Sequence, residues 1–290
     1  MSNLPRLAVT GATGEVGGRV ARRLSDAGVE QRLVVRRSPD APSLPGAVAV
    51  EASDYGNFEE MARALQGAST LFLVSGRESR HRLEQHMTAV DAAARAGVER
   101  IVYLSFLGAS PDATFTLARQ HHATEQHIRE HRMRFTFLRS SMYADFVPYF
   151  AGSDGIIQGP AGEGRVSWIS RDDIADTVVA VLGDHSYDGE TLDNTGPAAL
   201  DLEETAAVLS RVTGRGIGYV DETVEQAWES RRGSGAPDWE IEGWVSSYVA
   251  IAAGQMDIVS GTVERLTGRP ARDLESFLAE NPGLWSHLVV

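Results

Sequence analysis

The chain has 290 residues, a formal net charge of −13, 42% hydrophobic residues and no cysteine. This length fits one or two domains, and the absence of cysteine excludes disulfides, thiolate metal sites and cysteine nucleophiles. The negative charge argues against binding along a nucleic-acid backbone, and no apolar run is long enough to cross a bilayer. We therefore expect a cytoplasmic globular protein, a monomer or a homodimer, whose partner is a small-molecule substrate rather than nucleic acid or a membrane.

Short apolar segments alternate with amphipathic ones through the first half of the chain. The apolar segments are typical of buried parallel strands and cover residues 7–10, 32–35, 47–50, 70–74 and 100–104. The amphipathic segments predict helices over 15–27, 57–66, 80–96 and 115–131, several of them ended by a glycine at 28, 67 or 97. This alternation predicts a doubly wound α/β fold of the Rossmann type, with a parallel sheet.

The second half of the chain predicts a lobe that is interwoven with this sheet. A sixth strand is expected over 135–139, after which a glycine-rich stretch at 152–164 interrupts the alternation. Residues 171–182 predict a helix capped by Asp172 or Asp173, and residues 190–196 predict a strand that returns to the sheet. We expect a dinucleotide-binding domain over 1–150 and a smaller, mainly helical substrate-binding lobe over 151–290, of which 171–196 rejoins the sheet.

Gly11, Gly14 and Gly17 form a G-x-x-G-x-x-G motif between the first expected strand and the first expected helix. In that context the motif is typical of a dinucleotide-binding loop, because glycines let the backbone approach a pyrophosphate whose charge then faces helix amides. The hydroxyls of Thr10 and Thr13 could add donors. A glycine-rich turn without a ligand is the weaker alternative.

The segment VVRRSPD at 34–40 lies where such folds contact the adenosine ribose. An acidic side chain there favours NAD, whereas a basic one accommodates the 2′-phosphate of NADP. Arg36 and Arg37 supply positive charge, and the nearest acid downstream is Asp40. The sequence therefore favours NADP(H), with NAD(H) possible, over the alternative of a solvated arginine pair.

Several segments resemble the NmrA-like, atypical short-chain dehydrogenase/reductase group, which includes type 2 NAD(P)H:quinone oxidoreductases and triphenylmethane reductases. They are VTGATGEVGGRV at 9–20, VVRRSP at 34–39, LFLVS at 71–75, VERIVYLSFLGA at 98–109, HHATEQHIRE at 121–130, TFLRSSMYADF at 136–146 and GRVSWISRDDIAD at 164–176. The resemblance places the adenine near Asp54. Together with the glycine motif it implies a cofactor held by Thr10, Gly11, Ala12, Thr13, Gly14, Glu15, Val16, Gly17, Arg36, Val74, Ser75, Gly76, Ser105, Phe106 and Leu107.

Candidate catalytic residues are few. The better-known short-chain dehydrogenases use a Tyr-x-x-x-Lys pair for proton transfer, and no lysine occurs in the matching neighbourhood. The resemblance places His121 where related members carry a lysine or a histidine, four residues before Glu125 on the same helical face. His121 is our first candidate for contact with cofactor or substrate, against the alternative of a surface histidine paired with Glu125. Tyr143, which follows the sixth strand at the expected ligand crevice, is the second.

Two other interpretations concern the same kinds of residue. His121, His122, Glu125 and His127 could ligate a metal, but no further protein ligand and no H-E-x-x-H pattern are identifiable, so we predict no metal site. Trp244 and Tyr248 lie four apart on an expected helix and could stack on a flat substrate, although helix packing explains them better.

These observations and the resemblance predict an NADPH-dependent oxidoreductase that transfers a hydride to a quinone-like, imine-like or conjugated acceptor. Such an acceptor tolerates the missing tyrosine–lysine pair, with a proton from His121, Tyr143 or water. The alternative is a regulator that binds NADP(H) and senses redox state without turnover; the missing general acids favour it, and the aromatic-bearing C-terminal lobe opposes it. An isomerase or dehydratase would ordinarily need a tyrosine near a lysine and is less expected.

Overall fold

The computed structural model describes residues 4–289, which form two compact units that the chain enters alternately. Unit 1 consists of the chain up to Ser105, Gln120–Arg139 and Ile174–Leu192. Unit 2 consists of Phe106–Arg119, Ser140–Asp173 and the chain from Asp193 onward. Within residues 4–289, no helix is long and apolar enough to span a membrane.

The main sheet has seven strands among the described residues, in the order β3-β2-β1-β4-β5-β6-β9. They are β1 (Leu7–Thr10), β2 (Gln31–Val35), β3 (Ala47–Glu51), β4 (Thr70–Leu73), β5 (Arg100–Phe106), β6 (Arg134–Ser140) and β9 (Thr191–Asn194). β1 is parallel to both of its neighbours, with Val9 opposite Leu33 of β2 on one side and Phe72 of β4 on the other. This order is that of the Rossmann dinucleotide-binding fold, so the predicted fold class is confirmed.

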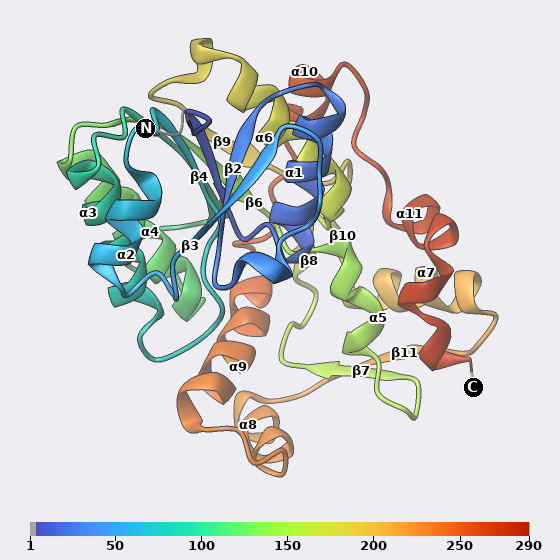
Figure 1. Cartoon of the computed structure of the whole chain (residues 1–290). Coiled ribbons are helices and arrows are strands. Elements are labelled where there is room, and N and C mark those ends of the chain that lie inside the picture. Colours follow the sequence, from blue (N-terminus) through green and yellow to red (C-terminus); the bar gives the residue numbers. More distant parts are fainter. Residues whose placement is uncertain (1–3, 290) are drawn as a thin grey trace. The chain divides into compact units, whose positions relative to one another are not determined.

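Helices cover both faces of this sheet (Figure 1). They are α1 (Glu15–Asp26), α2 (Phe58–Leu65), α3 (Arg82–Arg95), α4 (Thr116–Glu130) and α6 (Arg171–Gly183). In Figure 1, α2, α3 and α4 lie on one face and α1 and α6 on the other, where Arg23 pairs with Asp176 at 2.5 Å. Gly28, Gly67 and Gly97 have left-handed φ angles after α1, α2 and α3, as predicted for glycines that end helices.

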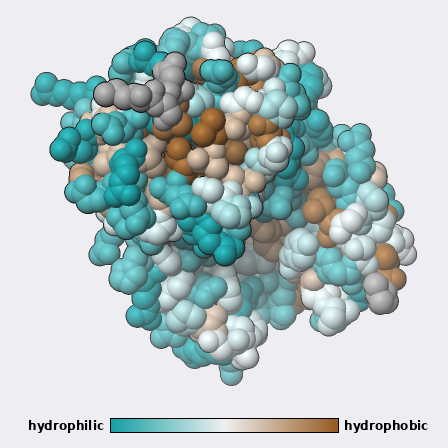
Figure 2. Space-filling model, viewed as in Figure 1, coloured by the Kyte–Doolittle hydropathy of each residue, from teal (hydrophilic) through white to brown (hydrophobic). Residues whose placement is uncertain are grey.

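The central strands are buried on both faces. Val9, Phe72 and Ile101 are each 0% exposed, whereas Val48 on the edge strand β3 is 42% exposed. In Figure 2 hydrophobic residues gather over the edge formed by β2 and β3, and the rest of the visible face is mainly hydrophilic. Burial on both faces explains why the central strands are continuous apolar segments rather than alternating ones.

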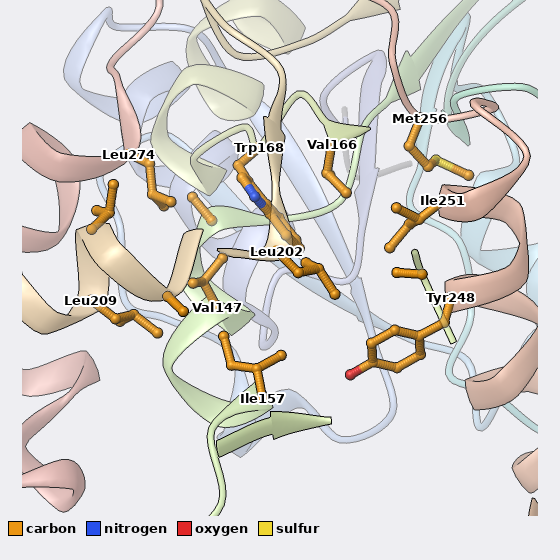
Figure 3. Packing of buried hydrophobic residues seen from close by; sticks show 14 of the residues in the cluster. Val147, Ile157, Val166, Trp168, Leu202, Leu209, Tyr248, Ile251, Met256 and Leu274 are labelled. Carbon is orange, nitrogen blue, oxygen red and sulfur yellow. The ribbon is translucent and has the colours of Figure 1, made fainter. Parts of the chain in front are cut away.

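Unit 2 has its own apolar core and two small sheets. β7 (Ile156–Gly159) pairs in parallel with β11 (Gly218–Asp221), and β8 (Arg165–Val166) pairs antiparallel with β10 (Leu200–Asp201). Its further helices are α5 (Val147–Phe150), α7 (Leu202–Thr213), α8 (Val224–Arg232), α9 (Asp238–Ala252), α10 (Thr262–Thr267) and α11 (Leu274–Glu280). Figure 3 shows Trp168 and Leu202 in this core, with Ile251 and Tyr248 of α9.

The start of α6 corrects one expectation. Ser170 Oγ accepts a hydrogen bond from the Asp173 N–H at 3.0 Å, so Ser170 caps the helix rather than Asp172 or Asp173. The Asp173 carboxylate is buried and pairs instead with Arg269 at 2.8 Å and Arg272 at 2.5 Å. Asp173 therefore links Arg269 and Arg272, which lie between α10 and α11, to the start of α6.

The aromatic residues of α9 are explained by packing. Tyr248 is 7% exposed, and its ring fills the space that a side chain at Gly159 would occupy, 2.4 Å from an added Cβ. Trp244 packs against a small cluster that includes Ile241 and Val245. The packing explanation therefore accounts for both side chains.

Candidate cofactor and active site

The glycine loop joins β1 to α1, and its three glycines meet different requirements. Gly11 has a φ of +65°, which side chains disfavour. A Cβ added at Gly17 would lie 2.3 Å from the Gly11 carbonyl oxygen, so the helix packs this closely only without a side chain. At Gly14 an added Cβ would meet only that oxygen, at 3.3 Å, among the described residues. The fold requires glycine at 11 and 17, whereas at 14 a side chain would meet a single backbone oxygen of the described residues.

The start of α1 offers backbone N–H groups to an anion. First-turn amides lack intrahelical acceptors, and within the described chain no side chain caps this helix, whose N-cap is Gly14. Ala12 in the loop and Val16 in the first turn of α1 are buried, whereas Thr13 and Glu15 are exposed. The Glu15 carboxylate forms an ion pair with Arg19, which compensates its charge. The amides and the helix dipole therefore favour a pyrophosphate here.

The two arginines that follow β2 differ in what they bind. Arg37 donates from Nε and Nη2 to the two carboxylate oxygens of Asp40, at 2.9 and 2.8 Å. Arg36 is exposed, and it forms no hydrogen bond or ion pair with any of residues 4–289. Asp54, expected near the adenine, lies in an exposed turn after β3, where its Oδ1 accepts from the Gly56 N–H at 2.5 Å. Of the arginine pair, Arg36 is thus the cation available to a ligand.

The loop after β4 begins with Val74, which two side chains hold in place. Thr10 Oγ1 donates to the Phe72 carbonyl at 3.1 Å and accepts from the Val74 N–H at 2.9 Å. The Tyr55 hydroxyl donates to the Val74 carbonyl at 2.8 Å. Because the Thr10 hydroxyl is used within the protein, Thr10 has only its backbone to offer a ligand. Ser75, next in the loop, is partly exposed.

Gly76, the third residue of this loop, is held by α3. Its N–H donates to His86 Nε2 at 2.8 Å, and its carbonyl accepts from Arg82 Nε at 2.9 Å. Since His86 Nε2 is an acceptor, the proton of the neutral ring is on Nδ1, which lies 3.1 Å from Thr124 Oγ1 on α4. Burial, and then the charge of Arg82, lower the pKa of His86 well below its usual value. His86 is therefore a neutral link between the loop and α4.

His121 lies beside this group and is also neutral. Arg82 Nη2 lies 2.9 Å from His121 Nε2, and the Tyr103 hydroxyl lies 2.8 Å from His121 Nδ1. A guanidinium can only donate, so Nε2 accepts and Nδ1 carries the proton toward Tyr103. Burial, followed by the charge of Arg82, lowers the pKa of His121 well below its usual value. Both ring nitrogens are thus engaged inside unit 1.

Glu125 has partners other than the one proposed from the sequence. Its carboxylate is 0% exposed, accepts from Arg139 Nε at 2.9 Å and Nη2 at 2.6 Å, and accepts from Ser105 Oγ at 2.6 Å. His121 is only 5% exposed. The alternative of a surface histidine paired with Glu125 is therefore wrong. Ser105, an expected cofactor residue near the end of β5, donates its hydroxyl proton to Glu125.

The remaining expected residues lie in unit 2. Phe106 packs edge-on against Phe115, with ring centroids 5.0 Å apart, and the buried Leu107 donates its N–H to the Ser140 carbonyl at 3.0 Å. Tyr143 is partly exposed and stacks on Phe146, with ring centroids 6.0 Å apart and planes 7° apart.

Arg171 completes the surroundings of Tyr143, and it was not among the site residues expected from the sequence. Its guanidinium carbon lies 5.5 Å from the centre of the Tyr143 ring and 4.4 Å from that of Phe146, which is 46% exposed. Asp145, 1% exposed, accepts from the Arg171 N–H at 3.0 Å. The start of α6 could have drawn attention to Arg171, but only the fold brings that position to Tyr143. The cluster offers a flat aromatic surface with a cation over it.

The order of the sheet, the uncapped glycine loop and the available Arg36 together define a dinucleotide-binding protein of the Rossmann type. The chain belongs to the NAD(P)H-binding family, which matches residues 11–185. It is 31% identical over 273 residues to an NAD(P)H azoreductase of Xenophilus azovorans, covering 93% of this chain and 95% of that protein.

Two solved structures share the fold over nearly the whole chain. One is an NADPH-dependent quinone oxidoreductase of Escherichia coli in complex with NADPH, 28% identical, with a TM-score of 0.86 over 94% of this chain and 99% of that one. The other is a triphenylmethane reductase of Citrobacter sp. in complex with NADP(H), 28% identical, with a TM-score of 0.83 and the same coverage. These relatives are NAD(P)H-dependent oxidoreductases, as the sequence predicted for this chain.

Proposed function

We propose that the protein is an NADPH-dependent reductase of the atypical short-chain dehydrogenase/reductase group, acting on a quinone-like, imine-like or conjugated small molecule. The observation that carries the preference for NADPH is Arg36, exposed and uncommitted directly after β2, beside an arginine that Asp40 already engages. The relatives named azoreductase, quinone oxidoreductase and triphenylmethane reductase support hydride transfer to a conjugated acceptor.

The residues present fit NADP(H). The carboxyl ends of parallel strands meet at one edge of a sheet, so the loops after β1, β2 and β4 face the same crevice. The amides at the start of α1 suit the pyrophosphate, and the space at Gly14 allows its approach. Arg36 suits the 2′-phosphate. Val74, Ser75 and Gly76 form the next part of this edge, where the Thr10, Tyr55, His86 and Arg82 side chains fix the backbone.

When bound, the reduced nicotinamide supplies a hydride from its C4 position. The protein's own contribution is chiefly to position the reactants and exclude water. All 27 residues counted as lysine and arginine are arginine, so the chain has no lysine for a tyrosine–lysine acid. His121 and His86 are neutral, with ring nitrogens bound inside unit 1. We propose that they position the Val74–Gly76 loop, and that Tyr143 or water supplies any proton.

The engagement of both His86 and His121 inside unit 1 also favours the second candidate, a regulator that binds NADP(H) without turning it over. Sensing requires the same loop and the same Arg36 but no acceptor site. The two functions therefore differ in turnover and not in cofactor binding.

The test is a fluorescence titration of the full chain with NADPH and with NADH, followed by addition of quinones, azo and triphenylmethane dyes and cyclic imines while reduced-nicotinamide absorbance is recorded. Saturable NADPH binding with consumption in the presence of an acceptor supports the reductase. Tight binding without consumption by any acceptor class supports the regulator. Absence of binding to either dinucleotide overturns both.

A further inference from the structure

A second group of side chains in unit 1 has the composition of a metal site. Asp91 on α3, His127 on α4 and His131 just after α4 each place a ligand atom within 4.8 Å of the other two. His127 Nε2 lies 2.6 Å and His131 Nε2 lies 2.7 Å from the same oxygen, Oδ1 of Asp91. We propose that these three residues bind a divalent transition-metal ion of the zinc class, which goes beyond the proposed reductase function.

The geometry of the two rings suits a shared ion. Their planes are 90° apart and their centroids 4.9 Å apart, so they do not stack, and their Nε2 edges converge on Asp91. Tetrahedral zinc with bonds of about 2.1 Å needs ligand atoms about 3.4 Å apart. The two contacts with Asp91 must therefore widen by less than about 1 Å. The His127 and His131 side chains are 21% and 30% exposed, so small rotations achieve this and leave a fourth position open to water.

The charges around His127 also favour a cation. Glu130 Oε2 lies 3.4 Å from His127 Nδ1, while Asp91 faces Nε2, so a carboxylate stands at each ring nitrogen. A neutral imidazole carries only one N–H and cannot donate to both. With a metal on Nε2, the ring proton on Nδ1 faces Glu130, which is the outer-carboxylate arrangement common at metal-bound histidines. Within residues 4–289 no arginine pairs with Asp91 to compete for its charge.

Two of the three ligands lie on neighbouring helices, Asp91 on α3 and His127 on α4, and His131 follows α4 directly. α3 and α4 run side by side and parallel, as the successive contacts of Arg82 with His121, His86 with Thr124 and Asp91 with His127 show. His131 lies four residues after His127, so its side chain is on the same face.

Arg132, two residues after the end of α4, has a φ of 55°, the one non-glycine positive φ among the described residues. This conformation is disfavoured for arginine, and it turns the chain immediately after His131.

The ligand set indicates the class of ion. Two imidazole nitrogens and one carboxylate oxygen suit zinc, cobalt, nickel or copper, whereas magnesium and calcium prefer oxygen ligands. Sequence inspection considered only His127 of this group, with His121, His122 and Glu125. His121 and Glu125 have other partners, and the contributions of Asp91 and His131 come from the packing of α3 on α4.

The experiment is a zinc titration of the full-length protein after chelator treatment, with a chromophoric chelator as competitor to obtain stoichiometry and Kd. We expect one equivalent to bind the wild type, and His127→Gln and His131→Gln each to raise Kd at least tenfold. His81→Gln is the matched control, because His81 is an exposed histidine 3.1 Å from Glu84 that has no third ligand atom beside it within residues 4–289. It should leave Kd within twofold of the wild type.

Absence of saturable binding to the wild type overturns the proposal, as does a Kd within twofold of wild type in both glutamine variants. Cobalt provides a measurement on the wild type that does not depend on any variant folding. One equivalent of Co²⁺ should give the intense visible absorption of a four-coordinate ion, unaffected by excess Mg²⁺. A weak, octahedral-type spectrum at one equivalent, or displacement by Mg²⁺, also overturns it.

Discussion

Replacing Arg36 by alanine tests cofactor selectivity most directly, because the side chain has no structural partner within residues 4–289 to lose. An arginine hydrogen-bonded to a phosphate contributes about 1.5–3 kcal/mol, and an exposed ion pair about 0.2–1 kcal/mol. Arg36 is exposed but would bind a doubly charged group, so we expect an intermediate loss of about 1–2 kcal/mol. This corresponds to a Kd for NADPH that rises about five- to thirty-fold.

The assay is fluorescence titration of the wild type and Arg36→Ala with NADPH and NADH. The Kd for NADH should change less than about twofold, because NADH lacks the 2′-phosphate. Arg37→Ala is the matched control: Arg37 is the adjacent, equally charged residue, but Asp40 holds its guanidinium. Equal losses for both dinucleotides, or a larger effect of Arg37→Ala than of Arg36→Ala on NADPH, would refute the assignment of Arg36 to the phosphate.

Three further predictions follow from the unit 1 contacts. Gly14→Val should remove binding of both dinucleotides with little change in melting temperature. Gly17→Ala should lower the melting temperature, because the new Cβ at position 17 would lie 2.3 Å from a backbone oxygen. Arg139→Met should lower the free energy of unfolding in urea by about 3–5 kcal/mol by leaving Glu125 buried and unpaired, and adding Glu125→Met should restore much of it.

The third prediction concerns pH. In the folded protein the pKa values of His86 and His121 lie below 6.5, so as pH falls the unfolded chain binds protons at these residues before the folded chain does. The free energy of unfolding is therefore highest above about pH 6.5 and decreases below it. Between about pH 7.5 and 5, each should account for a loss of up to about 2 kcal/mol. His121→Gln should flatten that decrease, and an unchanged slope would contradict the neutral state assigned to His121.

The fold could be predicted because its signals are local. Each central strand is a short apolar segment buried on both faces. Each of the helices α1, α2 and α3 is followed by a glycine with a left-handed φ, a conformation that depends on the glycine itself and not on distant residues. The glycine motif was recognisable for the same reason: the roles of Gly11 and Gly17 depend on a turn of seven residues. Local sequence contains all of this information.

The surroundings of His121 could not be predicted, because its partners come from distant elements. Arg82 is 39 residues away on α3 and Tyr103 is 18 residues away on β5, so only the parallel packing of α3 and α4 beside the sheet brings them together. The helical spacing suggested Glu125 instead, but the partly exposed Arg139 guanidinium binds that carboxylate through two of its nitrogens. The cap of α6 was mispredicted for a simpler reason, since Ser170 and the aspartates that follow it are all good capping residues.

The buried histidines also limit the chemistry that unit 1 can perform. For His121 to give its Nδ1 proton to a ligand, the ring would have to leave the Tyr103 hydroxyl, a group whose pKa burial raises, so that it does not readily replace the lost proton. Forming an imidazolium there would place two cations together, since Arg82 already donates to Nε2. A substrate that needs a strong acid at the moment of hydride transfer is therefore poorly served by this unit. A quinone or a conjugated cation, whose reduction stabilises charge within the acceptor itself, makes no such demand. This is the physical reason why a chain without lysine, in which the buried His86 and His121 are neutral and engaged, fits acceptors of that class.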